Sequence, residues 1–440
     1  MKTNVITIDC GTSFLKAAIF KDDSEQIMES MQIETKDLLI EGKFKKIEGT
    51  LVAVQKILKK FTKYGKDFIL SISTEMHGFV LTDDSNNLIC DYFSWQDELA
   101  LQTKDNQSYL NFLNEKIIMS DIMKSGMKCK AGIASTNLYV WLDKNLDWKE
   151  KKIYFYTLGD YIIKSLSNRQ PYIHPTNAAA TGLYDLCNCN WNKELIKFYG
   201  FENVQFPKVS ENQEIVCAIK DTRYKIYPAI GDQQATLYGS GLERNGQLSF
   251  NLGTGSQVSV LSKSLDFSLK YQIRPFFHGY NLITIPHIPC GRALNVYFGF
   301  IENILKTYNS ELLIDKNKIW QILTNCSPDK ESENLSINMS FFDNSSNSYV
   351  GGSIGNILEN NFDMNHLSDG IMKQMVQNYR EAVKNLPIEF FDMLVFSGGV
   401  SQKVPALRNQ IASEFRCDNI LVAQNETFLG LLKYVKNNIL

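Results

Sequence analysis

The amino-acid sequence predicts an α/β fold built from two similar halves. Segments with strand-like and helix-like patterns follow one another along the chain, which is typical of α/β proteins. A strand, a turn rich in Gly, Thr and Ser, and a second strand occur twice, in residues 4–20 and in residues 247–261. At 440 residues, the chain is also longer than one compact core usually accommodates. Together these observations indicate two duplicated domains.

The two repeated segments share one plan. Residues 4–20, NVITIDCGTSFLKAAIF, place a turn at 11–13 between an apolar β-branched run and an alternating one. Residues 247–261, QLSFNLGTGSQVSVL, repeat this plan around a turn at 253–256. Each segment predicts a β-hairpin with a polar, glycine-containing tip. Because one hairpin falls in each half, we expect duplicated domains over residues 1–242 and 243–440.

Other periodic segments support the α/β class. After the second hairpin, MLVFSGGVSQ predicts a buried strand that ends in a pair of glycines before a helix. Residues 325–347 are rich in Ser, Asn and Asp, which predicts irregular surface structure. Further strands are expected at 68–73 and 214–219, and helices at 141–148, 160–167 and 369–386.

Composition argues against several classes of function. Hydrophobic residues make up 44% of the chain and charged residues 21%, which is ordinary for a globular protein. The net charge is only −2, so we expect neither nucleic acid nor a membrane surface as a partner. No apolar run approaches the ~20 residues that a membrane span needs. Nine cysteines without a repeating spacing indicate reduced thiols, and we expect a cytoplasmic protein.

Both hairpin tips are suited to binding phosphate. Glycine lets the backbone approach closely, and hydroxyl and amide groups can donate to phosphate oxygens. In the first hairpin, Asp9 precedes the turn, where it can hold Mg²⁺ directly or through water, and Lys16 follows as a cation. No GxxxxGK[ST] motif occurs in the chain. One such turn is compatible with an ordinary hairpin, but the pair together with Asp9 favours a nucleotide site.

The segment AIGDQQATLYGSGL places Asp232 at the start of a predicted helix. An ordinary helix N-cap is one interpretation of this position. The neighbouring glycines favour a tighter arrangement, in which Asp232 faces a cleft and accepts the proton of a hydroxyl that attacks a γ-phosphate. A carboxylate with a pKa near roughly 4 is a weak base at neutral pH. It suffices for phosphoryl transfer, which depends mainly on positioning and charge neutralisation.

Four motifs together resemble those of one enzyme family. DCGTSFLK is similar to the first phosphate motif of the FGGY carbohydrate kinases, NLGTGS to the second, GDQQA to the segment bearing their catalytic aspartate, and SGGVSQ to their adenosine-binding turn. The resemblance implies two duplicated actin-like (ribonuclease H-like) ATPase domains with an interdomain cleft, ATP and Mg²⁺ as cofactors, and Asp232 as the catalytic base. The cofactor-binding residues that it implies are Asp9, Gly11, Thr12, Ser13, Lys16, Gly253, Thr254, Gly255, Gly398, Gly399 and Gln402.

Within this family, STEMHGFVL and YFSWQDE resemble the sugar-pocket segments of ketose kinases, and of sedoheptulokinases in particular. The segments TLGDYIIKSL, NAAATGLYD and RPFFHGYNLITI add to that resemblance. It implies a small-molecule sugar as the phosphate acceptor, either a ketose such as sedoheptulose or a xylulose- or ribulose-type pentulose. We expect a monomer or homodimer. The substrate-binding residues that it implies are Glu75, Met76, His77, Trp95 and Asp97.

The chain departs from the family pattern at several positions. Phe14 stands where Ser or Thr is usual, and Glu75 where Gln is usual. Lys16 replaces the commoner Arg, and Lys403 follows Gln402 where Asn is common. The departures at Phe14 and Lys403 motivate an alternative, a non-catalytic sugar or nucleotide sensor with the same fold. An actin-like ATPase acting on protein partners is a further alternative, but it would not need the Met-His-Gly and Trp-Gln-Asp segments.

Two further patterns are weaker. His278, His287 and Cys290 could be imagined as a metal site, but their spacing matches no zinc pattern. Residues 351–355 contain a GxSxG string, yet it follows a polar run rather than the buried strand of a hydrolase nucleophile elbow. We expect a glycine-rich turn there.

Overall fold

The computed structural model divides the chain into two compact units. Unit 1 comprises Met1–Gly239, Lys263–Leu282 and Asn425–Leu440, and unit 2 comprises Ser240–Ser262 and Ile283–Gln424. This division is not contiguous along the chain, unlike the expected domains 1–242 and 243–440, because two later segments return to unit 1. The structure describes residues 3–21, 24–38, 46–315, 318–321, 335–341 and 351–439.

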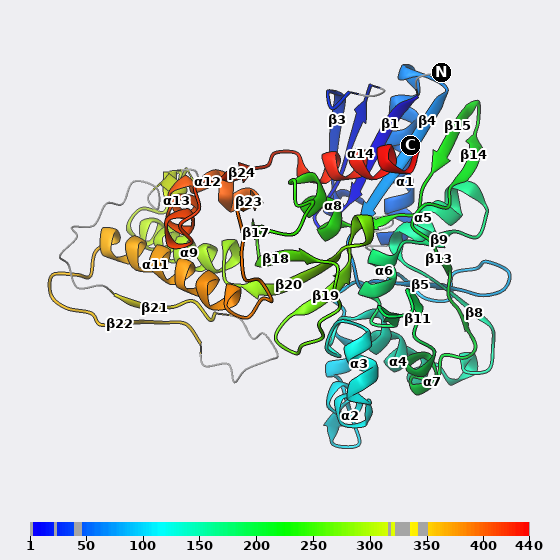
Figure 1. The fold of residues 1–440 in the computed structure, drawn as a ribbon, viewed down its shortest axis with the longest axis horizontal. Helices are drawn as coiled ribbons and strands as arrows, with labels where there is room; N and C mark the ends of the chain where they lie inside the picture. Colours follow the sequence, from blue (N-terminus) through cyan, green and yellow to red (C-terminus); the bar gives the residue numbers. More distant parts are fainter. Residues whose placement is uncertain are drawn as a thin grey trace. The chain divides into compact units, whose positions relative to one another are not determined.

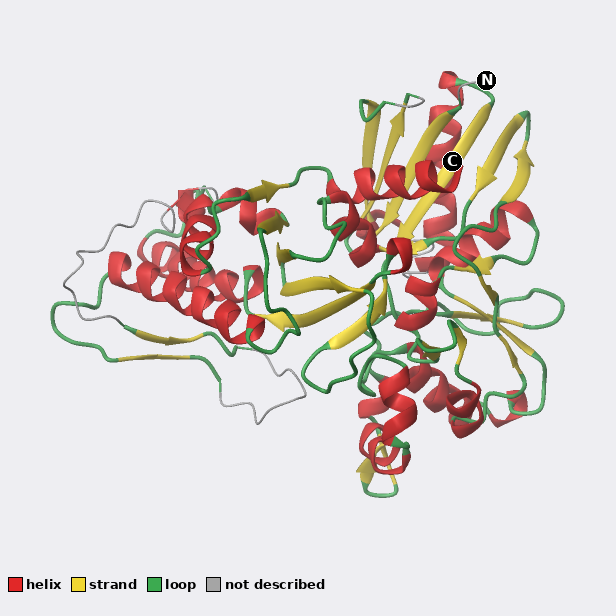
Figure 2. Cartoon of the chain, in the orientation of Figure 1, coloured by secondary structure: helices red, strands yellow, loops and turns green. Residues whose placement is uncertain are grey.

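A twisted mixed sheet forms the centre of unit 1 (Figure 2). Its strands lie in the order β14-β15-β4-β1-β2-β3, and a short β16 also pairs with β4. The pairs β1/β4, β4/β15 and β4/β16 are parallel, whereas β1/β2, β2/β3 and β14/β15 are antiparallel hairpin pairs. The strands are β1 (Asn4–Cys10), β2 (Phe14–Phe20), β3 (Ile27–Glu34), β4 (Asp67–Thr74), β14 (Ile215–Ile219), β15 (Thr222–Ile226) and β16 (Ile230–Gly231).

Helices cover both faces of this sheet. Helices α1 (Lys46–Phe61) and α5 (Leu158–Ser167) pack on one face, where alternate strand residues such as Ile6 and Ile8 join their apolar residues in one buried cluster. On the other face, α14 (Glu426–Ile439) lies across β1 and β4 (Figure 1). Because side chains alternate along a strand, Asp9 faces the side that carries α14.

Two glycines explain why the C-terminal helix belongs to unit 1. A Cβ on Gly239 of α8 (Asp232–Gly239) would lie 1.7 Å from the carbonyl oxygen of Glu426. A Cβ on Gly430 would lie 1.9 Å from the carbonyl oxygen of Ala235. The backbones of α8 and α14 are therefore in direct contact, which only glycine permits. This contact fixes α14 beside the helix that begins at Asp232.

A second layer of unit 1 is built around a smaller sheet. Strands β5 (Val80–Thr82), β8 (Ile153–Tyr156) and β12 (Val204–Gln205) pack with α4 (Ala134–Lys144) and α7 (Lys193–Phe198) in a separate apolar cluster. A third cluster joins α6 (Pro175–Ala180) to Ile273 on β19 (Gln272–Pro275). Neighbouring short elements are α2 (Tyr109–Lys116), α3 (Met119–Lys124), β9 (Tyr172–Ile173), β10 (Tyr184–Asp185), β11 (Asn190–Trp191) and β13 (Lys208–Val209).

Unit 2 repeats the central arrangement of unit 1. The hairpin β17 (Gln247–Leu252) and β18 (Ser256–Ser262) is antiparallel, and β23 (Met393–Ser397) pairs parallel with β17. This arrangement β23-β17-β18 matches β4-β1-β2 of unit 1, so the predicted duplication is visible in the topology. The sheet continues to β20 (Asn281–Ile288) on one side and β24 (Ile420–Val422) on the other, with helices α9 (Gly291–Tyr308), α11 (Met364–Val383), α12 (Gly399–Lys403) and α13 (Pro405–Glu414).

Most expected elements are present, with local differences. The helix expected at 141–148 ends at Lys144, because Asn145 leaves the helical region, and residues Leu146–Trp148 form a 3-10 turn. The expected irregular stretch contains a strand, β21 (Ser336–Asn338), and much of that stretch lies outside the described residues. The last three residues of the GxSxG string form the strand β22 (Ser353–Gly355), which pairs with β21, so the string is not a nucleophile elbow. No described helix is long and apolar enough to cross a membrane.

Candidate active site

Two acidic residues of unit 1 lie at the carboxyl ends of neighbouring parallel strands. Thr74, the last residue of β4, pairs with Cys10 at the end of β1 and with Gly231 at the end of β16. Glu75 and Asp232 follow directly after β4 and β16. Parallel strands place their carboxyl ends at one edge of the sheet, where ligand sites of α/β proteins occur. The structure thus brings together two residues that are far apart in the sequence.

Asp232 is a half-buried carboxyl with a raised pKa. It is the first residue of α8, and its Oδ1 accepts a 2.7 Å hydrogen bond from the backbone N–H of Gln233. Burial, followed by the charges of Asp9 and Glu75, raises the pKa of Asp232 to about 7. A carboxyl at that pKa is a much better proton acceptor near neutral pH than the sequence suggested. Asp232 can therefore both accept the hydrogen bond at the start of α8 and act as a base.

Close packing holds the corner before Asp232. The backbone N–H of Gly231 donates a 3.0 Å hydrogen bond to Oγ1 of Thr176. A Cβ on Gly231 would lie 2.6 Å from Oε1 of Gln234 and 2.9 Å from the sulfur of Met76. Met76, predicted to line the sugar pocket, therefore packs directly against the strand that leads to Asp232.

Asp9 provides a third carboxylate to this edge of the sheet. Its Oδ1 accepts a 2.8 Å hydrogen bond from the hydroxyl of Ser73, and Lys16 lies opposite it on β2. Burial raises the pKa of Asp9, while the Ser73 hydrogen bond and the charge of Lys16 lower it. The described residues hold no group of three or more His, Cys, Asp or Glu that could bind a metal ion. A single carboxylate fits Mg²⁺ that takes its other ligands from water and phosphate.

The first hairpin tip is hydrogen-bonded to both predicted sugar segments. The hydroxyl of Thr12 donates to Oε2 of Glu75 at 2.6 Å, and the indole N–H of Trp95 donates to Oγ1 of Thr12 at 3.2 Å. The N–H of Gly11 closes the turn on the carbonyl of Phe14 at 3.1 Å. Ser13 at the tip is exposed. The link through Thr12 was not foreseen from the sequence.

The Met-His-Gly segment has a strained and tightly packed backbone. His77 adopts a φ of 72°, and its Nδ1 lies 2.6 Å from the carbonyl oxygen of Ala180. Because a carbonyl only accepts, Nδ1 carries the proton and the ring orientation is fixed. A Cβ on Gly78 would lie 2.1 Å from the hydroxyl of Tyr92, which explains the glycine. Positive φ in a non-glycine residue is uncommon and often marks a functional position.

Tyr92 is a half-buried tyrosine whose buried hydroxyl interacts with the charges of two predicted sugar ligands, Glu75 and Asp97. The sequence analysis did not single it out. Its pKa is raised well above the usual value, chiefly by burial and then by the charges of Glu75, Asp232 and Asp97. Asp97 is exposed, and its Oδ2 accepts from the N–H and hydroxyl of Ser94 at 2.7 and 2.9 Å. Contacts therefore link Glu75, Met76 and Trp95 to this edge of unit 1, and Asp97 acts through its charge on Tyr92. His77 contacts Ala180 instead.

In unit 2, the predicted phosphate and adenosine turns lie against each other. Gly398 adopts a φ of +87°, and a Cβ there would lie 2.6 Å from the carbonyl oxygen of Leu252 and 3.0 Å from the nitrogen of Gly253. Gly398 must therefore be glycine. By contrast, a Cβ on Gly399 would meet nothing within 4 Å. The side chains beside the turns are also joined, since Nδ2 of Asn251 donates to Oγ of Ser397 at 3.0 Å.

The start of α9 supports the second hairpin tip. The N–H groups of Gly291 and Arg292 donate to the carbonyls of Gly253 and Thr254 at 3.1 and 2.8 Å. A Cβ on Gly291 would lie 2.7 Å from the Gly253 carbonyl oxygen. Thr254 and Gly255 remain exposed at the tip. The sequence analysis did not predict that the start of α9 contacts the hairpin tip. Gly291, a glycine at the first position of a long helix, could have indicated a close backbone contact there.

Gln402 and Lys403, the last two residues of α12, make different contacts. Gln402 is exposed, and its Nε2 lies 3.4 Å from the carbonyl oxygen of Ala423, at the upper limit for a hydrogen bond. The ammonium of Lys403 lies 4.9 Å from the ring centre of Trp320, a cation–π contact. The ammonium group of Lys403 is therefore engaged by Trp320. The contact of Gln402 with adenosine stays a prediction.

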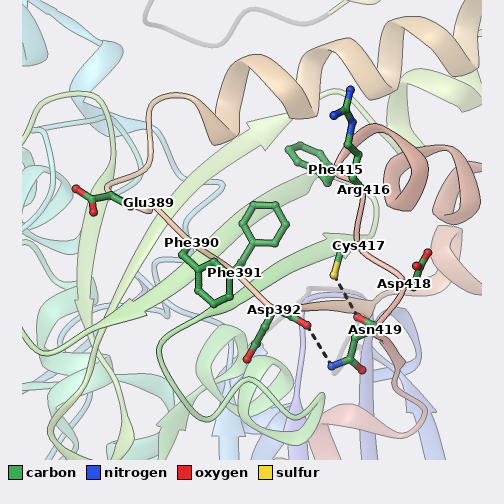
Figure 3. A pocket seen from close by; sticks show the side chains of 9 residues that line it. All are labelled: Glu389, Phe390, Phe391, Asp392, Phe415, Arg416, Cys417, Asp418 and Asn419. Carbon is green, nitrogen blue, oxygen red and sulfur yellow. Dashed lines mark hydrogen bonds between the residues drawn. The ribbon is translucent and has the colours of Figure 1, made fainter.

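A hollow of about 440 Å³ in unit 2 is distinct from these residues (Figure 3). It lies at the segments that precede β23 and β24, whereas Gly398 follows β23 at the opposite end of the strand. The hollow contains none of the residues predicted to act in catalysis or binding. Its lining is Glu389, Phe390, Phe391, Asp392, Phe415, Arg416, Cys417, Asp418 and Asn419.

Residues 4–236 match the family model described as "FGGY family of carbohydrate kinases, N-terminal domain". The chain belongs to the FGGY family of carbohydrate kinases. This match covers the first phosphate hairpin, both sugar segments and Asp232, and it ends within α8. FGGY membership agrees with the resemblance seen in the sequence.

Comparisons with individual proteins support the fold. The chain is 23% identical over 290 residues to xylulose kinase of Staphylococcus xylosus, covering 62% of this chain and 58% of that one. The match thus spans less than two thirds of this relative's length. Ligand-bound xylulose kinase from Lactobacillus acidophilus has a TM-score of 0.80 at 19% identity, covering 99% and 89% of the two chains. Plasmodium falciparum glycerol kinase with ADP has a TM-score of 0.79 at 16% identity, covering 100% and 90%. These FGGY structures confirm the expected α/β fold with actin-like, ribonuclease H-like domains.

Proposed function

We propose that the protein transfers the γ-phosphoryl group of ATP to a hydroxyl group of a sugar. The observation that carries this proposal is Asp232, whose raised pKa of about 7 suits it to accept a hydroxyl proton near neutral pH. It lies at one edge of a sheet with Asp9 of the first phosphate hairpin and packs near Met76 of the sugar segment. A structural N-cap would not require these neighbours.

The residues of the chain have separate roles in this reaction. Asp232 accepts the proton of the attacking sugar hydroxyl. This makes the hydroxyl oxygen a better nucleophile as the phosphoryl group is transferred. Lys16 and the donors of the first hairpin tip neutralise phosphate charge, and the tip at 253–255 serves the same purpose in unit 2. Gly398, Gly399 and Gln402 receive the adenosine. Mg²⁺, which Asp9 would hold directly or through water, would supply further neutralisation of phosphate charge.

The sugar is held by the side chains after β4 and around Trp95. Nδ1 of His77 donates to the Ala180 carbonyl, which fixes the orientation of the imidazole that we assign to a sugar hydroxyl. Asp97 accepts from further hydroxyls, while Met76 and the indole of Trp95 form apolar walls. Glu75 lies between the sugar and the Thr12 hydroxyl.

The phosphate acceptor is a small-molecule sugar. The protein acts in the cytoplasm as a monomer or homodimer. Sequence resemblance favours a ketose such as sedoheptulose. Xylulose kinases occur both among the relatives and among the similar solved structures, which supports a pentulose as the alternative.

Release of ADP with a sugar panel tests the proposal. We expect turnover with ATP, Mg²⁺ and at least one of sedoheptulose, xylulose and ribulose, and a loss of about 10²–10⁴-fold in kcat for Asp232→Asn. Asp67→Asn, an exposed carboxylate at the start of β4, is the matched control and should retain activity. Absence of sugar-dependent turnover, with sugar binding retained in calorimetry, would instead identify a non-catalytic sensor.

A further inference from the structure

Arg274 is a buried cation without an acidic partner among the residues that the structure describes. Its exposed fraction is 2%, and burial lowers its pKa to about 10. Its Nη2 donates a 3.0 Å hydrogen bond to Oε1 of Gln272. Its Nε and Nη1 are buried and have no hydrogen-bond acceptor within the described part of the chain. A buried charge left unpaired is strongly destabilising, so its presence calls for an explanation.

Lys130 is a second cation of unit 1 whose charge interacts with that of Arg274. It is half-buried, and its pKa is lowered by burial and then by the charges of Arg274 and Lys128. No ion pair of Lys130 or Arg274 is seen in the described ranges. Like charges repel each other most where water is excluded, so two such cations together increase the cost. An anion bound between the two cations would neutralise their charges and remove both the cost of the unpaired Arg274 and the repulsion between the two groups.

The segment that carries Lys130 joins Arg274 to one of the predicted sugar segments. At one end, the N–H of Ile273 donates to the carbonyl of Gly126 at 2.8 Å. At the other end, a Cβ on Gly132 would lie 2.3 Å from the carbonyl oxygen of Trp95. Residues 126–132 therefore run from β19 to Trp95, with Lys130 between.

A second path joins Arg274 to the proposed base. Nε2 of Gln234 lies 3.5 Å from the carbonyl oxygen of Pro275, the residue after Arg274. The Oε1 of Gln234 is buried beside Gly231, which precedes Asp232, and has no donor among the described residues. The residues on either side of Arg274 therefore lie against both regions: Ile273 bonds to the segment that leads to Trp95, and Pro275 lies 3.5 Å from Gln234 in the helix of Asp232.

We propose that Arg274 and Lys130 form a subsite for an anionic group on the sugar, so that the preferred acceptor is a sugar carrying a carboxylate or phosphate. This inference rests on the proposed sugar kinase function. The Asp232 end of the sugar presents the hydroxyl to be phosphorylated, and the anionic end pairs with the guanidinium and the ammonium. Guanidinium groups suit carboxylate and phosphate because their planar N–H donors match these oxygens.

Binding by calorimetry without ATP tests the subsite. The matched ligands are D-gluconate against D-glucitol, D-fructuronate against D-fructose, and D-fructose 6-phosphate against D-fructose. We expect at least one anionic ligand to bind about tenfold or more tightly than its neutral counterpart. The carboxylate and phosphate pairs distinguish the two sources of negative charge.

Arg274→Met and Lys130→Met should each abolish that preference while leaving neutral sugars bound as before. Arg223→Met, the same change at an exposed arginine of unit 1, should leave the preference intact. Arg274→Met is expected to melt no lower than the unmodified protein, because an apolar side chain replaces an unpaired buried charge. If that variant does not fold, Lys130→Met, at a half-buried position, tests the subsite by itself.

Equal affinity for anionic and neutral sugars would overturn the subsite, as would a preference that survives both substitutions. Turnover assays separate this failure from failure of the proposed function. Phosphorylation of neutral sugars with no advantage for anionic ones refutes the subsite alone. Turnover of no sugar at all refutes the proposed function.

Discussion

The hydroxyl of Thr12 donates a 2.6 Å hydrogen bond to Oε2 of Glu75. Thr12 belongs to the first phosphate hairpin, and Glu75 belongs to the segment that leads into Met-His-Gly. The hydroxyl of Thr12, a predicted nucleotide ligand, is therefore oriented by Glu75, a predicted sugar ligand. Since the charge of Glu75 also raises the pKa of Asp232, a single side chain influences both the hairpin and the proposed base.

Replacing Glu75 with Gln, the usual residue of the family, should shift the activity profile toward lower pH. The amide removes a negative charge that raises the pKa of Asp232, so the base loses its proton more readily. Because burial and Asp9 are the larger causes, we expect a shift of less than about one pH unit. The measurement is kcat/KM for the sugar against pH. A profile that stays in place or moves toward higher pH would contradict the assignment.

In the unmodified protein, kcat/KM for the sugar should rise with pH through about 7. Asp232 acts as a base only when it has lost its proton, and its pKa is raised to about 7. Activity should fall about tenfold for each pH unit below that value. Steady-state kinetics from pH 5 to 9 measure this dependence, and an activity plateau extending down to about pH 5 would exclude Asp232 as the titrating base.

Asp232→Asn should stabilise the folded protein at pH 8 but not at pH 4. As pH rises from about 4 to about 7, the unfolded chain releases this proton first, so the group makes stability fall with rising pH. Asn removes that penalty, which is on the order of a few kcal/mol above pH 7. Thermal unfolding at both pH values measures the effect. Asp67→Asn, at an exposed position, should show no such pH dependence, and equal effects of the two substitutions would refute the explanation.

Gly430→Ala should destabilise the protein although it lies inside a helix. Ala normally stabilises a helix interior by about 1 kcal/mol relative to Gly. Here the added Cβ would lie 1.9 Å from the carbonyl oxygen of Ala235, so α14 must move away from α8. We expect a loss of at least about 3 kcal/mol in unfolding free energy. Gly299→Ala in α9, where a Cβ meets nothing within 4 Å, is the control and should not destabilise.

Gly398→Ala and Gly399→Ala should differ in their effect on nucleotide binding. At Gly398 a Cβ would collide with Leu252 and strain a φ of +87°, which displaces the turn next to Gly253. We expect a rise of about tenfold or more in KM for ATP, while KM for the sugar changes little. Gly399→Ala meets no atom within 4 Å and should change KM for ATP less. Equal effects would mean that this turn does not position the nucleotide.

Local sequence patterns were sufficient to predict the strands and hairpins that carry the site. Alternating and continuous apolar residues mark β1, β2, β17 and β18, because side chains alternate across a strand whatever the rest of the chain does. The hairpin tips were visible for a similar reason, since a tight turn with exposed hydroxyls needs Gly, Thr and Ser locally. The partners of these elements were harder to predict, as the return of α14 to unit 1 shows.

The sequence by itself determined the α/β class, the duplicated hairpins and the identity of Asp232 as a candidate base. It could not determine that Glu75 and Asp232 follow paired strand ends, or that Arg274 is buried and its charge interacts with that of Lys130. It also underestimated Asp232 as a base, because a pKa of about 7 arises from burial and from charges brought in by distant residues. Strand and turn preferences depend on neighbours along the chain. Desolvation and Coulomb interactions depend on neighbours in space, and only the tertiary structure decides which residues those are.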